Sequence, residues 1–257
     1  MDLNTVLNVD TLSVGYGPKV IADSISFELK AGELSAIVGI NGIGKSTLLK
    51  TIGGFLPKLS GSIKIQHAEL TTIETLELAT KISVVLTDPI ASKNMSVKEL
   101  LTLGRQPYTN WLGRLTQKDK QVIGDSCALL ELEDFLDKKC DQLSDGQLQR
   151  VMVARALVQD TTIILLDEPT THLDLYHKVK IFKLLKQIAH QTKKTILFTS
   201  HEIELAIQLC DKILVLDGKE NTFDDPCNLI KNKSFDTLFP SDLIAFDSAT
   251  GSFRIVK

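Results

Sequence analysis

The sequence predicts a mixed α/β fold organised around a phosphate-binding loop, and three observations support this prediction. A glycine-rich stretch, residues 39–47, lies between an apolar run and a segment of helical composition. A second apolar run, residues 162–166, ends in two carboxylates, which is typical of a buried parallel strand with ligand groups at its carboxyl end. The residues before about 34 alternate between apolar and polar, which is typical of antiparallel strands. We predict one domain with a core of residues 1–86 and 150–234, a helical insertion of about 87–149 and a β tail of about 235–257.

Composition and charge limit the functions open to this chain. Of its 257 residues, 43% are apolar and 24% are charged, and the formal net charge is −3. Because there is no basic excess to displace counterions, we expect no nucleic acid as the main partner. The first residues lack the basic start and apolar core of a secretion signal, and no run approaches the ~18 apolar residues of a membrane span. We therefore expect a cytosolic chain that reaches a membrane only through a partner.

The opening segment has the pattern of short antiparallel strands. Apolar and polar residues alternate in 12–14 and 25–29, and glycines separate these runs. Tyr16 lies between two glycines, where its ring is either a stacking surface for adenine or an aromatic packed beneath a turn. A stacked base would contribute about 1–3 kcal/mol, by analogy with the binding of single-stranded nucleic acids.

A phosphate-binding loop is predicted at residues 39–47, which read GINGIGKST and fit G-x-x-x-x-G-K-[ST]. Glycines allow successive backbone N–H groups to surround an anion, and the helix that follows adds the positive end of its dipole. Lys45 would reach the β- and γ-phosphates, and Ser46 would offer its hydroxyl to Mg²⁺. The predicted nucleotide-binding residues are Tyr16, Gly39, Asn41, Gly42, Gly44, Lys45, Ser46 and Thr47.

Two strands and a helical stretch are predicted after the loop. Residues 61–65 and 82–86 have strand composition, and the second run is nearly all apolar or β-branched, as in a strand covered on both faces. A helix is predicted to begin after Ser96, and residues 116–119 resemble a capping box in which Asp replaces the usual Glu or Gln. The loop between these helices carries Trp111, which belongs either to a docking surface or to a local core.

The segment of residues 143–147 reads LSDGQ. Ser144 and Gln147 have the S-x-x-Q spacing of a capping box, so a helix is predicted to begin here. A well-capped helix is the simplest interpretation of these residues. Gly146, which has no side chain, would also let an anion approach the helix N-terminus.

Two later strands end in residues suited to phosphate chemistry. Asp167 and Glu168 follow the apolar run 162–166. Asp167 would hold Mg²⁺ through its water shell, and Glu168 would polarise the water that attacks the γ-phosphate. His201 follows the strand predicted at 195–200, where an imidazole could hydrogen-bond the γ-phosphate. The predicted catalytic residues are Glu168, His201 and Lys45, and the predicted metal ligands are Ser46 and Asp167.

The C-terminal part adds a strand at about 212–218 and a small hairpin within 244–256. Three histidines without a strand-end setting are expected to be solvated, namely His67, His177 and His190. Four cysteines lack C-x-x-C spacing, which favours reduced, half-buried thiols over a zinc site or disulfides. They are Cys127, Cys140, Cys210 and Cys227.

In their order along the chain, the glycine-rich loop, LSDGQ, the Asp167-Glu168 strand, the turn at 173–174 and His201 resemble the nucleotide-binding subunit of an ABC transporter. The resemblance covers about residues 5–230. It implies a P-loop NTPase core of the RecA-like type, with an antiparallel β subdomain and an inserted helical subdomain, that hydrolyses ATP with Mg²⁺. It also implies a head-to-tail homodimer in which the signature of one chain closes on the ATP of the other. The signature residues are Ser144, Asp145, Gly146 and Gln147, with Asp145 in place of the first glycine of the family's LSGGQ.

Three short sequence motifs match one branch of this family best. Residues 104–107 (GRQP), together with LSDGQ and residues 169–175 (PTTHLDL), look like the branch that energises bacterial uptake of iron-siderophore, haem or cobalamin. The resemblance implies two membrane permease subunits, an external substrate-binding protein, and a peripheral location on the cytoplasmic face of the inner membrane. The helical insertion would dock the cytoplasmic helices of the permease.

The sequence departs from the family pattern after the strand predicted at 82–86. The family usually places there a Gln that touches Mg²⁺ and links the site to the permease, whereas this chain has Thr87 followed by Asp88. The hydroxyl of Thr87 or the carboxylate of Asp88 could still act as a ligand. Both side chains are shorter than that of Gln, so we assign the usual coupling contact to neither residue.

Two alternative functions belong to other classes. A soluble ABC ATPase could remodel a protein or nucleoprotein complex, although the chain has no second ATPase half, no long heptad arm and no basic tract. A simple kinase or GTPase on the same loop would leave residues 144–147 and His201 without a role. In such systems the selectivity for the transported ligand belongs to other subunits.

Overall fold

A central, mostly parallel sheet organises the molecule. The computed structural model describes residues 4–87 and 94–256. The sheet has the strand order β10-β9-β3-β8-β7-β6, and in it β10 pairs antiparallel with β9 while the remaining pairs are parallel. Its strands are β3 (Leu34–Val38), β6 (Ile82–Val85), β7 (Ile163–Leu166), β8 (Thr195–Ser200), β9 (Lys212–Val215) and β10 (Thr222–Asp224). Strands β3, β7 and β8 are buried along their whole length, which explains their continuous apolar composition.

A second, antiparallel sheet has the order β2-β1-β4-β5. Its strands are β1 (Thr5–Tyr16), β2 (Lys19–Lys30), β4 (Ser60–Ile65) and β5 (Ala68–Glu69). The expected antiparallel pairing is confirmed, but the expectation of short strands is wrong, because β1 and β2 each have 12 residues. Register shifts along this pair absorb left-handed residues such as Thr11 and Ser24. A bulge interrupts the alternation of a sequence without ending the strand.

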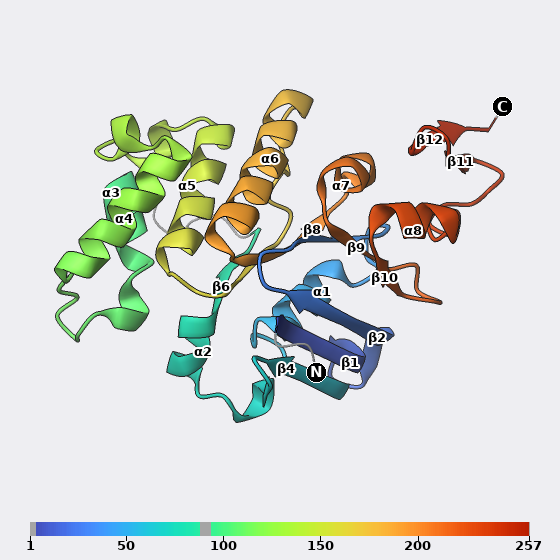
Figure 1. The fold of residues 1–257 in the computed structure, drawn as a ribbon, viewed down its shortest axis with the longest axis horizontal. Helices are drawn as coiled ribbons and strands as arrows, with labels where there is room; N and C mark the ends of the chain where they lie inside the picture. Colours follow the sequence, from blue (N-terminus) through green and yellow to red (C-terminus); the bar gives the residue numbers. More distant parts are fainter. Residues whose placement is uncertain (1–3, 88–93, 257) are drawn as a thin grey trace.

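Helix α1 (Lys45–Ile52) lies between the two sheets (Figure 1). Its buried Leu48, Leu49 and Ile52 share one core with the inner faces of both sheets. The other face of the central sheet is covered by α6 (Leu175–Thr192) and α7 (Ile203–Leu209), which share a second core with it. The central sheet therefore separates two cores and holds the loop before α1 at the carboxyl ends of its parallel strands.

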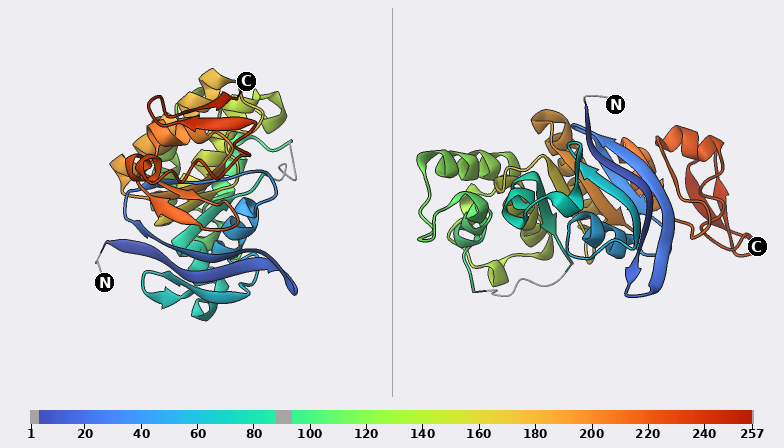
Figure 2. Two further views of the ribbon diagram at one scale, coloured as in Figure 1. Left: turned by 90° about the vertical axis from the view of Figure 1, so that its right-hand side faces the viewer. Right: turned by 90° about the horizontal axis from the view of Figure 1, so that it is seen from below.

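The helices of the predicted insertion lie at one end of the molecule (Figures 1 and 2). They are α3 (Val97–Leu103), α4 (Gln117–Leu130) and α5 (Asp145–Val158). The three predicted helix starts are confirmed, since Ser96, Thr116 and Ser144 each cap the helix that follows within a complete capping box. Helix α5 continues without a break through position 149, so the boundary that we place there stays a prediction.

The remaining elements lie around these layers. They are α2 (Thr75–Lys81), α8 (Pro226–Lys231), β11 (Ile244–Asp247), β12 (Ser252–Ile255) and the 3-10 turns Leu70–Thr72, Gln106–Tyr108, Glu133–Phe135 and Cys140–Gln142. The predicted terminal hairpin is confirmed: β11 pairs with β12, and the pair lies at the end opposite α3 and α4 (Figure 2). Among the described residues, no helix combines the length and the apolar composition that crossing a bilayer requires.

The cysteines differ in burial from the expectation. Cys127, Cys140 and Cys210 are free but buried rather than half-buried, and Cys227 is free and exposed. The first three lie on the core sides of their segments and join the larger core. Burial also raises the pKa of the Cys127 and Cys140 thiols above the usual range, so these groups stay protonated and unreactive.

A buried ion pair holds the helical end together. Arg105 donates from Nε to Oδ1 of Asp119 at 2.8 Å and from Nη1 to the carbonyl of Val158 at 2.9 Å. The guanidinium carbon also lies 4.0 Å from the ring centroid of Tyr108. Burial alone would raise the pKa of Asp119, but hydrogen bonds from Thr116 and Arg105 outweigh it and keep this pKa below the usual range.

The loop between α3 and α4 carries Trp111. Its side chain is 91% exposed, so its interpretation as part of a local core is wrong.

Replacing Asp119 by Ala should lower the free energy of unfolding by about 3–5 kcal/mol, because the buried guanidinium of Arg105 loses its partner. Urea denaturation measures this change. The control is Asp125→Ala on the exposed side of the same helix, which should cost no more than about 0.5 kcal/mol. Equal costs for the two variants would contradict the role given to the ion pair.

Candidate nucleotide-binding site

The predicted nucleotide-binding and catalytic residues, apart from Gly39, meet in one hollow of about 490 Å³, here called the loop hollow. Contributions come from the end of β1, the loop before α1, and the carboxyl ends of β7 and β8. Its lining residues are Tyr16, Ile21, Asn41, Gly42, Gly44, Lys45, Ser46, Thr47, Glu168 and His201. All of these except Ile21 are sequence-predicted site residues. A hollow of this size lies within the range of about 300–1,000 Å³ that is typical of small-molecule and cofactor sites.

Close backbone packing explains the first glycine of the loop. A Cβ atom at Gly39 would lie 2.5 Å from the carbonyl oxygen of Leu216, the residue that follows β9. Any larger residue would push the loop away from the central sheet. The last glycine, Gly44, has a φ of 111° and directly precedes α1, so the chain enters the helix in a conformation that other residues rarely adopt.

Lys45 is buried at the base of the loop hollow and is 5% exposed. Its ammonium donates to the carbonyl oxygens of Gly39 at 2.9 Å and Ile40 at 3.1 Å, and lies 3.3 Å from Nδ1 of His201. Burial lowers the pKa of Lys45, while the nearby carboxylates of Glu168 and Asp167 oppose this shift. The cation is thus held between the loop and the ends of β7 and β8.

Tyr16 stands at the rim of the loop hollow. Its side chain is exposed, and its hydroxyl lies 3.4 Å from Oγ1 of Thr47. The exposure contradicts the interpretation of Tyr16 as an aromatic packed beneath a turn. The ring is available for stacking beside the phosphate loop.

Asp167 collects hydrogen bonds from three separate elements. Its Oδ1 accepts from Ser46 Oγ and from Thr199 Oγ1, both at 2.8 Å, and its Oδ2 accepts from Thr87 Oγ1 at 3.0 Å. The two predicted metal ligands, Ser46 and Asp167, are therefore in direct contact, with Thr87 beside them. Such a set of carboxylate and hydroxyl oxygens suits Mg²⁺. Asp88, the other candidate at this place, lies outside the described residues.

Glu168 has a left-handed backbone with a φ of 50°. This conformation is uncommon for a residue other than glycine and is found at sites where the surroundings determine it. Its N–H donates to Thr199 Oγ1 at 2.8 Å, its Oε1 lies 2.5 Å from Nε2 of His201, and its Oε2 accepts from Thr171 Oγ1 at 3.0 Å. The carboxylate is thereby oriented by two side chains as well as by its own backbone.

Thr199 is a site residue that we do not predict from the sequence. It is fully buried in β8 and donates to Asp167, while it accepts from the N–H of Glu168. The available signal is strand alternation, because Thr199 lies two positions before His201 and side chains two positions apart in an extended chain share one face. A threonine inside an apolar strand otherwise resembles any β-branched residue.

The four signature residues do not line the loop hollow of their own chain. Ser144, Gly146 and Gln147 line a separate hollow of about 560 Å³ between α4, α5 and α6, here called the signature hollow. Asp145 lies beside a third hollow, together with Thr87, Asp167 and Glu168. One copy of the chain thus presents the phosphate loop and the signature at different places.

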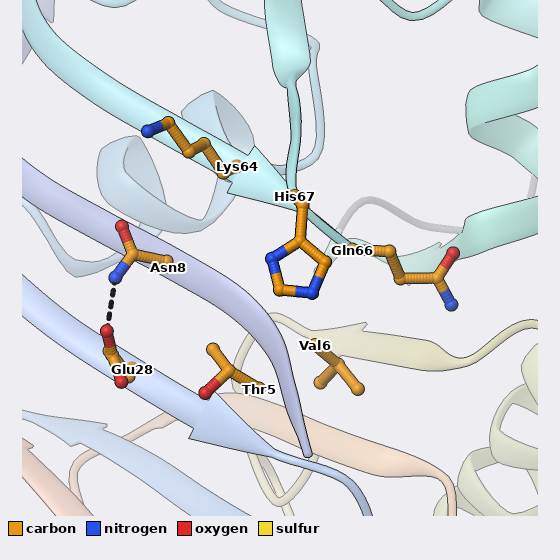
Figure 3. A pocket seen from close by; sticks show the side chains of 7 residues that line it. All are labelled: Thr5, Val6, Asn8, Glu28, Lys64, Gln66 and His67. Atoms are coloured by element: carbon orange, nitrogen blue, oxygen red, sulfur yellow. Dashed lines mark hydrogen bonds between the residues drawn. The ribbon is translucent and has the colours of Figure 1, made fainter. Parts of the chain in front are cut away.

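All three histidines expected to be solvated are exposed. Two of them also contact a carboxylate: His190 has Nε2 at 2.8 Å from Oδ2 of Asp211, and His177 has Nδ1 at 2.9 Å from Oδ1 of Asp174. His190 lies in α6 and Asp211 lies after α7. The local sequence around either residue therefore does not reveal this contact. His67 lies at a small hollow of about 30 Å³ on the antiparallel sheet (Figure 3), which has no room for a nucleotide.

The sequence comparisons decide the family. Residues 22–171 match the ABC transporter family. The chain belongs to this family. It is 36% identical to an uncharacterized ABC transporter ATP-binding protein of Methanocaldococcus jannaschii, over 97% of this chain and 87% of the relative. It is also 38% identical to the petrobactin import ATP-binding protein YclP of Bacillus subtilis, over 82% of this chain and 83% of the relative.

Solved structures agree with the family assignment. The fold resembles a metal-chelate type ABC transporter in an inward-facing conformation, with a TM-score of 0.80 and 26% identity over 98% of this chain and 96% of that chain. It also resembles a dimeric bacterial ABC transporter cassette, with a TM-score of 0.73 and 28% identity over 86% of this chain and 98% of that chain. The predicted ABC ATPase fold is confirmed. This protein is an ATP-binding subunit and an ATPase, like the members of the family that power transport.

In this ABC ATPase, Thr199→Val should reduce both stability and ATP turnover. The change keeps the shape of the side chain but removes the hydroxyl, so the N–H of Glu168 and the carboxylate of Asp167 each lose a partner. We expect the free energy of unfolding to fall by about 1–3 kcal/mol, measured by urea denaturation beside an ATPase assay. Thr199→Ser keeps the hydroxyl and should retain most of both properties. A Val variant equal to the Ser variant would disprove this role.

Proposed function

We propose that this ABC ATPase powers bacterial import of an iron chelate, a siderophore or haem, or of cobalamin. The observation that carries this proposal is the identity to import proteins over most of the chain. Besides the petrobactin protein, a probable siderophore transport system ATP-binding protein of Bacillus subtilis is 33% identical over 89% of this chain. The likeness to a metal-chelate type transporter supports the same ligand class.

We further propose that the chain works as a head-to-tail homodimer. The separation of the loop hollow from the signature hollow supports this arrangement, because each chain then offers half of each ATP site. The likeness to a dimeric cassette is consistent with it. Two membrane permease subunits, and through them an external substrate-binding protein, would complete the transporter. The chain would then be peripheral on the cytoplasmic face of the inner membrane.

The helical end is the proposed permease-docking region. It contains the exposed Trp111 and Leu112 on a loop that leads into α4. Exposed aromatic and aliphatic side chains on a loop are typical of a protein interface. Arg105 and Asp119 would support this loop from beneath, because Arg105 is buried against Tyr108 and pairs with Asp119. The core of residues 1–86 and 150–234 would carry the nucleotide chemistry.

The proposed residue roles follow from the loop hollow. Tyr16 would stack on adenine, and residues 39–47 would surround the phosphates with backbone N–H groups and the Lys45 cation. Ser46 and Asp167, with Thr87 beside them, would hold Mg²⁺. When bound, this ion neutralises charge on the phosphates.

Hydrolysis would depend on the pair of Glu168 and His201. Glu168 would accept a proton from the attacking water at a carboxylate oxygen, and its contact with His201 would keep the carboxylate turned towards the loop hollow. His201 also neighbours the Lys45 ammonium at 3.3 Å, so the imidazole lies between the proposed base and the phosphate-binding cation. On entry of a nucleotide it can hydrogen-bond the γ-phosphate from this position.

Glu168→Gln should bind ATP but hydrolyse it about 10²–10⁴ times more slowly, because the amide cannot accept the proton. The stalled protein should accumulate as an ATP-bound dimer. Turnover assays and light scattering with and without ATP measure the two effects. The matched control is Glu74→Gln, an exposed glutamate before α2, which should leave both unchanged. Normal turnover by Glu168→Gln would show that another group is the base.

Uptake by cells tests the ligand class directly. Cells that lack this chain should lose uptake of one of three labelled compounds, an iron-siderophore, haem or cobalamin. The intact chain should restore that uptake, and Lys45→Ala, which removes the phosphate-binding cation, should not. Unchanged uptake of all three, with the protein recovered only in a soluble complex without a multi-span partner, would overturn import in favour of remodelling.

A further inference from the structure

The signature glycine Gly146 lies against a side chain of its own protomer. A Cβ atom at this position would lie 3.0 Å from Cδ2 of His177, 3.5 Å from its Cγ and 3.6 Å from its Nε2. The imidazole on the first turn of α6 therefore packs directly on the backbone of the first turn of α5. The missing side chain at position 146 makes room for this ring.

The ring of His177 is held on its other side. Its Nδ1 lies 2.9 Å from Oδ1 of Asp174, and the same oxygen accepts the N–H of His177 at 2.9 Å as the N-cap of α6. The ring of Tyr176 meets it edge to face, with centroids 5.4 Å apart. Although the side chain of His177 is about half exposed, these contacts give its imidazole a defined place.

This packing brings two functional segments together. Asp174 lies on the turn that follows Glu168, and Gly146 lies within the signature at the start of α5. Among the described residues, no hydrogen bond or ion pair joins the first turns of α5 and α6, and the signature hollow leaves much of the space beside them open. Farther along, α5 and α6 share the larger core, so the contact between the imidazole and the Gly146 backbone is the one that bears on the spacing of their first turns.

We propose that His177 is a positioning residue that sets the place of the signature relative to the turn at Asp174. Its imidazole acts as a spacer between the two segments and touches no nucleotide itself. This inference rests on the proposed function, in which residues 144–147 close on the ATP of the partner subunit. It gives Gly146 a role in its own protomer, in addition to any access that the glycine allows to a phosphate.

A double-mutant cycle in the Glu168→Gln background tests the proposal. The variants are Gly146→Ala, His177→Ala and the two together, and light scattering measures the ATP concentration at half-maximal dimerisation. Each single change should raise this concentration by about tenfold. The pair should be no worse than His177→Ala alone, because the added methyl group then has room. Additive losses would show that position 146 requires glycine for another reason and would overturn the proposal.

Two further variants separate positioning from general damage. His177→Phe keeps the ring against Gly146 but loses the bond to Asp174, so its loss should be smaller than that of His177→Ala. His190→Ala is the matched control. This histidine also lies in α6 and pairs with an aspartate, but it does not line the signature hollow. It should change nothing. ATP affinity at the loop hollow, measured on dilute protein, should stay within about twofold in all variants.

Hydrogen exchange tests the positioning role without the dimer. His177→Ala should increase the exchange of the backbone amides at 146–150, and His177→Phe and His190→Ala should not. Unchanged exchange in His177→Ala would overturn the positioning role even where dimerisation follows expectation. If Glu168→Gln itself fails to dimerise with ATP, the proposed dimer is wrong, and the exchange measurement alone then decides the role of His177.

Discussion

The buried carboxylate of Asp167 is the constraint on which the site depends. An isolated carboxylate is costly to bury, and here hydroxyls from Ser46, Thr87 and Thr199 offset that cost. These three residues belong to α1, to the segment after β6 and to β8, so satisfying one side chain fixes three elements relative to β7. The phosphate loop gains its position from the same network, because Ser46 is part of both the loop and the carboxylate's surroundings.

The parallel sheet explains why so many functional groups share one edge. Strands β3, β7 and β8 run in the same direction, and the residues after each carboxyl end therefore meet at the same place. Glu168 keeps an unfavourable backbone there because Thr199, Thr171 and His201 all engage it. The antiparallel sheet adds Tyr16 to this edge from the side. By contrast, the signature lies at the start of α5, where Asp145 borders a separate hollow beside Asp167 and Glu168 and Gly146 packs against His177 of α6.

Local rules carried much of the prediction. The capping boxes at Ser96, Thr116 and Ser144 depend on residues three apart, and all three are present in the structure. The glycine-rich loop and the strand ends were predicted equally well, because each is a continuous string. Contacts between segments that are far apart in the sequence were not predicted. Thr199 supports Asp167 and Glu168 from a neighbouring strand, and nothing within β8 itself distinguishes this threonine from one that only fills space.

The sequence by itself determined the family, the order of the motifs and the identity of nearly every group in the loop hollow, because spacing within a loop or a helix turn is preserved on folding. Only the tertiary structure decided that Thr87 bonds to Asp167, that three cysteines are buried, and that His177 occupies the space over Gly146. Each of these facts concerns two segments that are far apart in the chain. Their contact is set by how the sheet and helices pack, and no local pattern records the distance between them.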